Sequence, residues 1–593
     1  MYSRAGTMNG KCLLRLLALL LFPLLLAAQQ APSSASPPEN SKAFSQGAAA
    51  LQRGDLAAAR AAFATAIREN PRNAKAANAL GLVMLAQHDA ASAIPQFQSA
   101  LRLQPSFVNA RLNLSNALLQ THDVQGAVRE ARSVVRIAPA EPDAHVALAR
   151  ALEASNDLDA AVAAIRRALD LSPGRADLHD NLGTLLVRQD NLPGASAEFQ
   201  KALELNPQLP AAFFHLGVLQ FEQKQFELAE KHLARAVEFD PQNYLARNFL
   251  GRSLRESGKL PDAISAFQSS LQLQPAQPDI LNLLGLSLQR VGNPADAAAA
   301  FREALRIQPQ NAETQNNLGL ALLQSGDGDG AIAAFRAALQ IHPGDSGYQG
   351  NLGAAYLQKA DYAAAEAEFR SALSASTDNQ TLHYNLGLAL KLQDKLPEAV
   401  SELRAAEAID PSQPDSPYTL GVTLWQMGDA DGAIEELTRA TRVKPDYAEA
   451  FYTLGTVLKQ QSKFQESAAA LREAIRLQPD FAGAHTTLAA VLRQLGDATG
   501  AASESRAGAE LAKQTTNLQA ALFATNSGRR LRNAGDLTGA ISQFRAAIQS
   551  VPDYAPAHFE LAIALRQAGK KEEAAAEFQK ATALDPKLVA PGQ

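Results

Sequence analysis

Hydrophobic residues recur along the chain with helical spacing, and the whole pattern returns every 34 residues. Between residues 312 and 345, Leu318 and Leu322 fall on one helical face, and Phe335 and Ala338 fall on a second. Residues three and four apart are neighbours on a helix, so each repeat predicts two helices and the chain as a whole an all-α fold. The period is marked by prolines, at Pro71, Pro105, Pro139, Pro173, Pro207, Pro241, Pro275, Pro309, Pro343, Pro411, Pro445 and Pro479.

With proline at position 32, the repeats run from 40–73 and 74–107 onward to 482–515, and a shifted frame gives 521–554 and 555–588. Position 8 is small, most often glycine as at Gly81, and position 20 is nearly always alanine. Position 24 is frequently phenylalanine, as at Phe97. This pattern predicts two closely approaching helices with the ring filling the space beside the small residues.

These small, aromatic and proline positions resemble those of the tetratricopeptide repeat (TPR) family, with about 16 copies between residues 40 and 588. The resemblance implies an α-α superhelical solenoid of helix-turn-helix repeats. In the family, a concave groove lined by the first helices usually binds peptides or partner proteins. The chain is most similar to exported bacterial members.

The frame breaks once, in repeat 482–515. Ser505 replaces the aromatic residue, Gly508 replaces alanine, and Lys513 replaces proline, with five extra residues before the next frame. Two interpretations stay open: a degenerate repeat with a longer loop, or a hinge. The predicted organisation is an array over 40–515 and a C-terminal pair over 516–588, followed by a tail at 589–593.

The first 28 residues predict a secretory signal peptide. Basic residues precede an apolar run from Leu16 to Leu26, and small residues follow it. The run is shorter than the roughly 20 residues of a comfortable membrane span. We expect cleavage after Ala28 and a flexible linker over 29–39, which places the protein in the periplasm or outside the cell. An uncleaved membrane anchor is the alternative.

Composition narrows the classes of function. Hydrophobic residues make up 47% of the chain, which argues against disorder. Residues 1–28 hold three of the 55 basic residues and no acidic residue. The mature chain would keep 52 basic and 60 acidic residues, a net charge of about −8. That balance disfavours binding to a nucleic-acid backbone. The single cysteine, Cys12, lies in the predicted signal, which excludes disulfides from the mature chain.

No residue pattern predicts catalysis, a cofactor or a metal site. Carboxylates fall on the expected solvated faces, and no glycine-rich phosphate loop follows a strand. Five histidines share position 4, where we expect a half-buried structural role between the helices of a pair: His145, His179, His383, His485 and His558. The sequence therefore predicts a protein that is not an enzyme.

The candidate groove residues lie on the exposed stripe of the first helices. Position 6 gives an asparagine row at Asn317, Asn351 and Asn385, and position 5 gives Tyr384, Tyr418 and Tyr452. The remaining candidates surround the only tryptophan: Trp425, Gln426, Lys459 and Gln460. A row of amides can pair with an extended peptide backbone, and rigid aromatic rings add apolar contact. Descent of the repeats from one another explains the rows equally well.

The asparagine row also resembles the ladder in the TPR segment of O-linked N-acetylglucosamine transferases, although no glycosyltransferase domain is present. TPR domains that clamp a C-terminal carboxylate use lysine at position 5 and a basic residue at position 6, whereas position 5 has no lysine here and position 6 has neither lysine nor arginine. The leading hypothesis is a non-enzymatic scaffold of the cell envelope that binds extended protein segments. The alternative is an accessory subunit for polysaccharide synthesis or export, or for a separate catalytic partner such as a glycosyltransferase.

Overall fold

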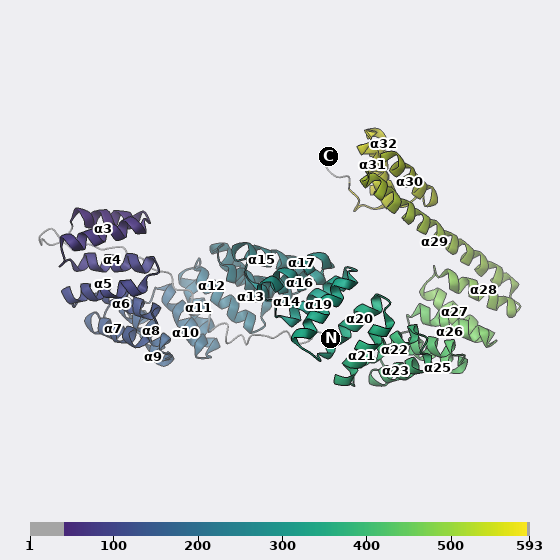
Figure 1. Ribbon diagram of the computed structural model, residues 1–593, viewed down its shortest axis with the longest axis horizontal. Helices are drawn as coiled ribbons and strands as arrows, with labels where there is room; N and C mark the ends of the chain where they lie inside the picture. The colour runs from purple at the N-terminus through teal and green to yellow at the C-terminus, as the bar shows by residue number, and fades with distance from the viewer. Residues whose placement is uncertain (1–40, 590–593) are drawn as a thin grey trace. The chain divides into compact units, whose positions relative to one another are not determined.

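The computed structural model describes residues 41–589, and this part of the chain contains helices and no strand (Figure 1). The first 16 helices are α2 (Lys42–Gln52), α3 (Leu56–Glu69), α4 (Ala74–Ala86), α5 (Ala90–Leu103), α6 (Val108–Gln120), α7 (Val124–Ile137), α8 (Pro142–Ala154), α9 (Leu158–Leu171), α10 (Ala176–Arg188), α11 (Leu192–Leu205), α12 (Pro210–Glu222), α13 (Phe226–Phe239), α14 (Tyr244–Glu256), α15 (Leu260–Leu273), α16 (Pro278–Arg290) and α17 (Pro294–Ile307). The others are α18 (Ala312–Gln324), α19 (Gly328–Ile341), α20 (Ser346–Gln358), α21 (Tyr362–Ala375), α22 (Gln380–Leu392), α23 (Leu396–Ile409), α24 (Asp415–Gln426), α25 (Ala430–Val443), α26 (Ala448–Gln460), α27 (Phe464–Leu477), α28 (Ala482–Gln494), α29 (Ala498–Asn533), α30 (Leu537–Ser550), α31 (Ala555–Gln567) and α32 (Lys571–Leu584). The predicted all-α repeat architecture is confirmed. The predicted signal, cleavage site and linker, and most of the tail, lie outside the described residues.

The described helices form two compact units, divided between Ala321 and Leu322 within α18. Before the long helix α29, even-numbered first helices pack against the odd-numbered second helices of their own repeats, as α4 does against α5 and α26 does against α27; beyond it, the first helix α31 packs against α32. The next first helix then packs against both: α6 contacts α4 and α5, and α28 contacts α26 and α27. In these repeats, the later first helix therefore lies in a notch between the two helices of the preceding repeat.

Glycine at position 8 lets the paired helices approach closely. A Cβ placed on Gly81 would lie 2.6 Å from Cε1 of Phe97, and one on Gly183 would lie 2.4 Å from Cε1 of Phe199. Both rings are fully buried. The predicted pairing of a small residue with an aromatic ring is confirmed, because a side chain at position 8 would occupy the space of the ring.

The turn inside each repeat depends on one residue in the left-handed conformation and on one cap. Glycine supplies the positive φ at many turns, as at Gly54 (φ 77°), while His88 and His122 supply it at others (φ 60° and 62°). In many repeats, the second helix then begins after an aspartate cap, as where the side chain of Asp55 accepts a hydrogen bond from the backbone N–H of Ala58 at 2.9 Å. These local signals end one helix and begin the next.

A single long helix spans the segment in which the repeat frame breaks. Residues 498–533 form α29, a helix of 36 residues that replaces the second helix of repeat 482–515, the linker and the first helix of repeat 521–554 (Figure 1). The expected longer loop is therefore wrong. No proline or glycine, the strongest helix-ending residues, lies between Gly508 and Gly528, so the sequence permits a continuous helix there.

Candidate functional site

The histidines at position 4 connect the second helix of their own repeat to the preceding repeat. Nδ1 of His485 lies 2.6 Å from Oε2 of Glu504 in the second helix, and its Nε2 lies 3.0 Å from the carbonyl oxygen of Pro479 in the preceding repeat. His383 makes the same pair of contacts with Glu402 and with the carbonyl of Thr377. The predicted structural role of these side chains is confirmed.

Neighbouring first helices are joined by polar pairs between position 5 of one repeat and position 6 of the next. These pairs recur at every third repeat. They are Asn78 with Asn113 (2.9 Å), Asp180 with His215 (2.8 Å), Asn282 with Asn317 (3.2 Å), and Tyr384 with Thr419 (3.3 Å). Position 6 thus contributes to the packing of successive first helices at these junctions.

The asparagines of the candidate row have different surroundings. Asn317 is buried in α18, where its side-chain N–H donates to Oδ1 of Asn282. Asn351 on α20 and Asn385 on α22 are half-buried. Asn317 belongs to the first unit, and Asn351 and Asn385 belong to the second. The burial of Asn317 leaves its side chain little surface for a ligand.

The three candidate tyrosines lie at the same position of successive first helices in the second unit. Tyr384 lies on α22, Tyr418 on α24 and Tyr452 on α26, and all three are half-buried. Burial raises the pKa of Tyr384, whose hydroxyl is paired with Thr419, so this phenol stays neutral at physiological pH. These helices are consecutive neighbours, since α24 contacts both α22 and α26.

Two aromatic residues that the sequence reasoning missed support these tyrosines. Tyr447 lies with its ring centroid 5.0 Å from that of Tyr418, and Phe481 lies 4.7 Å from Tyr452. Both occupy position 34, immediately before the next first helix, so their shared position was the available signal. Burial and the nearby Asp415 carboxylate raise the pKa of Tyr447, which donates a hydrogen bond to Asp415 at 3.3 Å.

The tryptophan forms a second junction between first helices. Nε1 of Trp425 donates to Oε1 of Gln460 at 2.6 Å, which links α24 to α26. Gln426 and Gln460 are exposed, whereas Trp425 and Lys459 are half-buried. The structure therefore places the aromatic and amide candidates of residues 380–460 on three adjacent first helices. We call the half-buried residues Tyr384, Tyr418, Tyr452 and Trp425 the aromatic face.

Within residues 41–589, no group of three or more His, Cys, Asp or Glu side chains is arranged to hold a metal ion. No helix of the described chain combines the length and the apolar character of a membrane span. The side chains of the aromatic face offer stacking and apolar contact, and the neighbouring Gln426 and Gln460 offer amide hydrogen bonding.

Comparison with protein families places the chain in the tetratricopeptide repeat family. One tetratricopeptide repeat model matches residues 44–106, 79–142, 112–176, 181–244, 282–346, 452–513 and 525–588. A second tetratricopeptide repeat model matches residues 322–388 and 390–458, and a model described as TPR repeat matches 251–292. The chain belongs to this family, and the resemblance inferred from the sequence is confirmed.

Solved structures of several TPR proteins resemble parts of the chain. The APC/C hetero-tetramer Cut9–Hcn1 is 15% identical, covers 76% of this chain and 97% of its own, and has a TM-score of 0.34. MamA from Desulfovibrio magneticus RS-1 is 22% identical over 29% of this chain and 96% of its own, with a TM-score of 0.28. YrrB, described as a TPR protein with an unusual peptide-binding site, is 26% identical over 32% of this chain and 96% of its own, with a TM-score of 0.28.

A comparison with curated proteins finds no match. The family and the fold define the class of the protein: it is a repeat scaffold for protein–protein interaction.

Proposed function

We propose that this protein is a non-enzymatic adaptor of the cell envelope that holds extended protein segments against the aromatic face. The observation that carries the proposal is the line of half-buried rings at one repeat position, with Tyr447 and Phe481 packed beside two of them. Rings held in this way lose little conformational entropy when a ligand binds. The exposed amides of Gln426 and Gln460 lie at the same repeat position, where they can donate to and accept from a peptide backbone.

Export remains part of this proposal and rests on residues 1–28. Mass spectrometry of the protein recovered from cells tests it directly. We expect a mature chain that begins at Gln29 and partitions with the periplasmic or extracellular fraction. An intact N-terminus in the membrane fraction would favour the anchored alternative.

The binding experiment uses the purified protein and two immobilised arrays, one of unstructured peptides and one of glycans. We expect retention on peptides, with a change in the fluorescence of Trp425. The double variant Tyr418→Ala, Tyr452→Ala should weaken binding by about 5- to 150-fold, because each aromatic contact contributes about 0.5–1.5 kcal/mol. Tyr362→Ala is the matched control, since Tyr362 is a half-buried tyrosine on the second helix α21.

Retention on glycans alone would instead favour the polysaccharide accessory, because aromatic rings also stack on sugars. Equal loss of binding in the double variant and the Tyr362 control would remove the aromatic face from the proposal. A triple variant with alanine at Asn317, Asn351 and Asn385 tests the asparagine row separately. Because Asn317 is buried and bonded to Asn282, we expect that variant to lose stability more than affinity.

A further inference from the structure

The long helix α29 leaves one docking notch of the repeat array empty among the described residues of its own chain. Elsewhere a first helix lies in the notch between both helices of the preceding repeat, as α28 does against α26 and α27. The notch of repeat 482–515 lies between α28 and residues 498–511 of α29. The first helix that would fill it is the other end of α29, and a straight helix cannot pack against itself.

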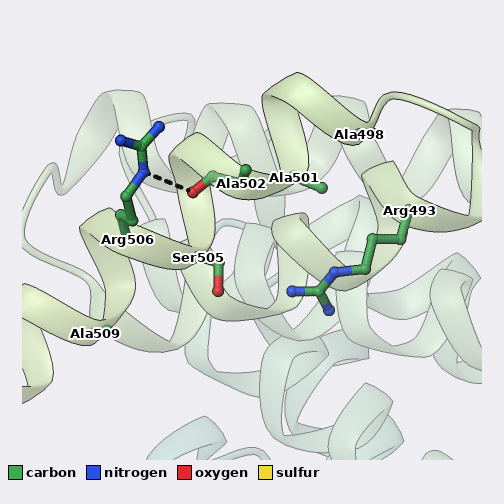
Figure 2. A pocket seen from close by; sticks show the side chains of 7 residues that line it. All are labelled: Arg493, Ala498, Ala501, Ala502, Ser505, Arg506 and Ala509. Carbon is green, nitrogen blue, oxygen red and sulfur yellow. Dashed lines mark hydrogen bonds between the residues drawn. The ribbon is translucent and has the colours of Figure 1, made fainter.

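This notch is visible as an open pocket of about 560 Å³ between α28 and the first half of α29 (Figure 2). Arg493 reaches it from α28, and Ser505 and Ala509 line it from α29. Arg506 lies at its edge, where its Nε donates to the carbonyl of Ala502 at 3.2 Å. Position 24 carries a large residue in most repeats, such as Leu471 or Phe544, so Ser505 leaves this notch unusually roomy.

The helix that should fill the notch carries an exposed phenylalanine. Position 3 of a first helix packs against the preceding repeat, as Ala557 does against Ala524 and Ala547. That position is buried in every described first helix that follows another repeat, except for the half-buried Tyr348 and for Phe523, which is 71% exposed. In the first described repeat, which has no described predecessor, the same position is the exposed Lys42.

A helix end that faces solvent in a repeat array needs a polar outer surface. Lys42 meets that requirement, and Phe523 does not. Residue sizes also match across the empty junction. Phe523 is larger than alanine, the commonest residue at position 3, while Ser505 is smaller than the residues usual at position 24. The notch and the ring therefore have complementary sizes.

We infer that two copies of this chain form a dimer in which residues 521–533 of each α29 dock in the notch of the other copy. Within the array, the second helix of one repeat packs against the first helix of the next repeat. The inferred contact reproduces this packing between two chains. Exchange of an identical element between protomers gives a closed two-fold arrangement. Successive helices of the array are antiparallel, so the two α29 helices run antiparallel and cross near the midpoint of α29, between Thr515 and Thr516.

Phe523→Ser tests the inferred dimer by sedimentation equilibrium of the purified full chain. We expect a dimer for the unaltered protein and a dissociation constant at least about 100-fold higher for Phe523→Ser, because two rings per dimer lose their burial. Leu518→Ser is the matched control. Leu518 is an apolar residue on the same helix, 43% exposed, and it lies about 140° around the helix from Phe523. It should leave the dimer intact.

A disulfide experiment tests the register independently of Phe523. In a Cys12→Ser background, the introduced thiol is the only one in the chain. Thr516→Cys should form an intermolecular disulfide rapidly under mild oxidation, because the two-fold axis brings residue 516 of one copy beside that of the other. Leu518→Cys, on a different face, should cross-link far more slowly.

A monomeric unaltered protein at micromolar concentrations would overturn the inference, and so would equal cross-linking by the two cysteine variants. If Phe523→Ser loses its helical circular dichroism, the cysteine variants decide alone. Dimers that persist unchanged in a folded Phe523→Ser variant would also overturn it. The dimer and the aromatic face are tested separately, since neither Phe523 nor Thr516 belongs to that face.

Discussion

Replacing Gly81 by alanine should destabilise the chain when Phe97 is present and stabilise it when Phe97 is absent. The added Cβ would lie 2.6 Å from Cε1 of Phe97, about 1 Å inside ordinary carbon contact. Overpacking of this kind costs about 1–3 kcal/mol, while exchanging glycine for alanine within a helix gains about 1 kcal/mol. The expected net loss of local stability is about 0–2 kcal/mol, so the overpacking decides the sign.

In the Phe97→Ala background the balance reverses. Phe97→Ala by itself should cost about 3–5 kcal/mol, because Phe97 is fully buried and glycine opposite has no side chain to fill the cavity. In this variant, the Cβ added by Gly81→Ala has no ring to clash with. It should recover about 1 kcal/mol from helix propensity and about 0.8 kcal/mol from one buried methyl group. The coupling between the two sites is therefore about 2–4 kcal/mol.

The chain contains natural versions of these pairings. Ser115 at position 8 faces Ala131 at position 24, so a larger residue at one site accompanies a smaller one at the other. In the last repeat, Ala562 at position 8 faces Phe578 at position 24, so the chain also contains a small side chain opposite a ring.

Hydrogen exchange of α4 and α5, followed by mass spectrometry of the full chain, measures this cycle. Local opening is the right quantity, because long repeat arrays unfold in parts and have no single unfolding free energy. Exchange protection should fall in Gly81→Ala and rise when the same change is added to Phe97→Ala. The same sign in both backgrounds would refute the proposed steric conflict at position 8.

Two further outcomes follow from the contacts of single carboxylates. Asp123→Ala should lower the stability of the start of α7 by about 0.5–2 kcal/mol, because Oδ1 of Asp123 accepts a hydrogen bond from the backbone N–H of Gly126 at 2.8 Å. Faster hydrogen exchange at the start of α7 would report this loss. Burial alone would raise the pKa of Glu577, but hydrogen bonds from His558 and Lys580 outweigh it and lower the pKa. Because the folded pKa lies below the unfolded one, the stabilisation is fully present above the unfolded value of about 4.3 and disappears as pH falls through the folded pKa. Glu577→Gln should therefore reduce the protection of α31 and α32 at neutral pH, and the difference from the unaltered protein should vanish in acid; a constant difference would count against this assignment.

Only part of the candidate site could be predicted from the sequence. Its rows of tyrosines were visible because a repeat array places equal positions on equal faces. The contacts of those side chains were not visible, because they depend on the neighbouring repeat. Asn317 illustrates this limit, since its place in an apparently exposed row gave no sign that Asn282 and burial would occupy it.

The sequence by itself determined the 34-residue period, the two helices of each repeat and the match of small and aromatic residues between them. These features depend on interactions within a few tens of residues, and caps, left-handed turns and helical spacing encode them locally. The course of the chain through residues 498–533 was decided by tertiary structure. Whether that segment turns or continues depends on which packing surfaces it can reach, and α29 continues at the cost of leaving Phe523 and the notch beside Ser505 without a partner among residues 41–589.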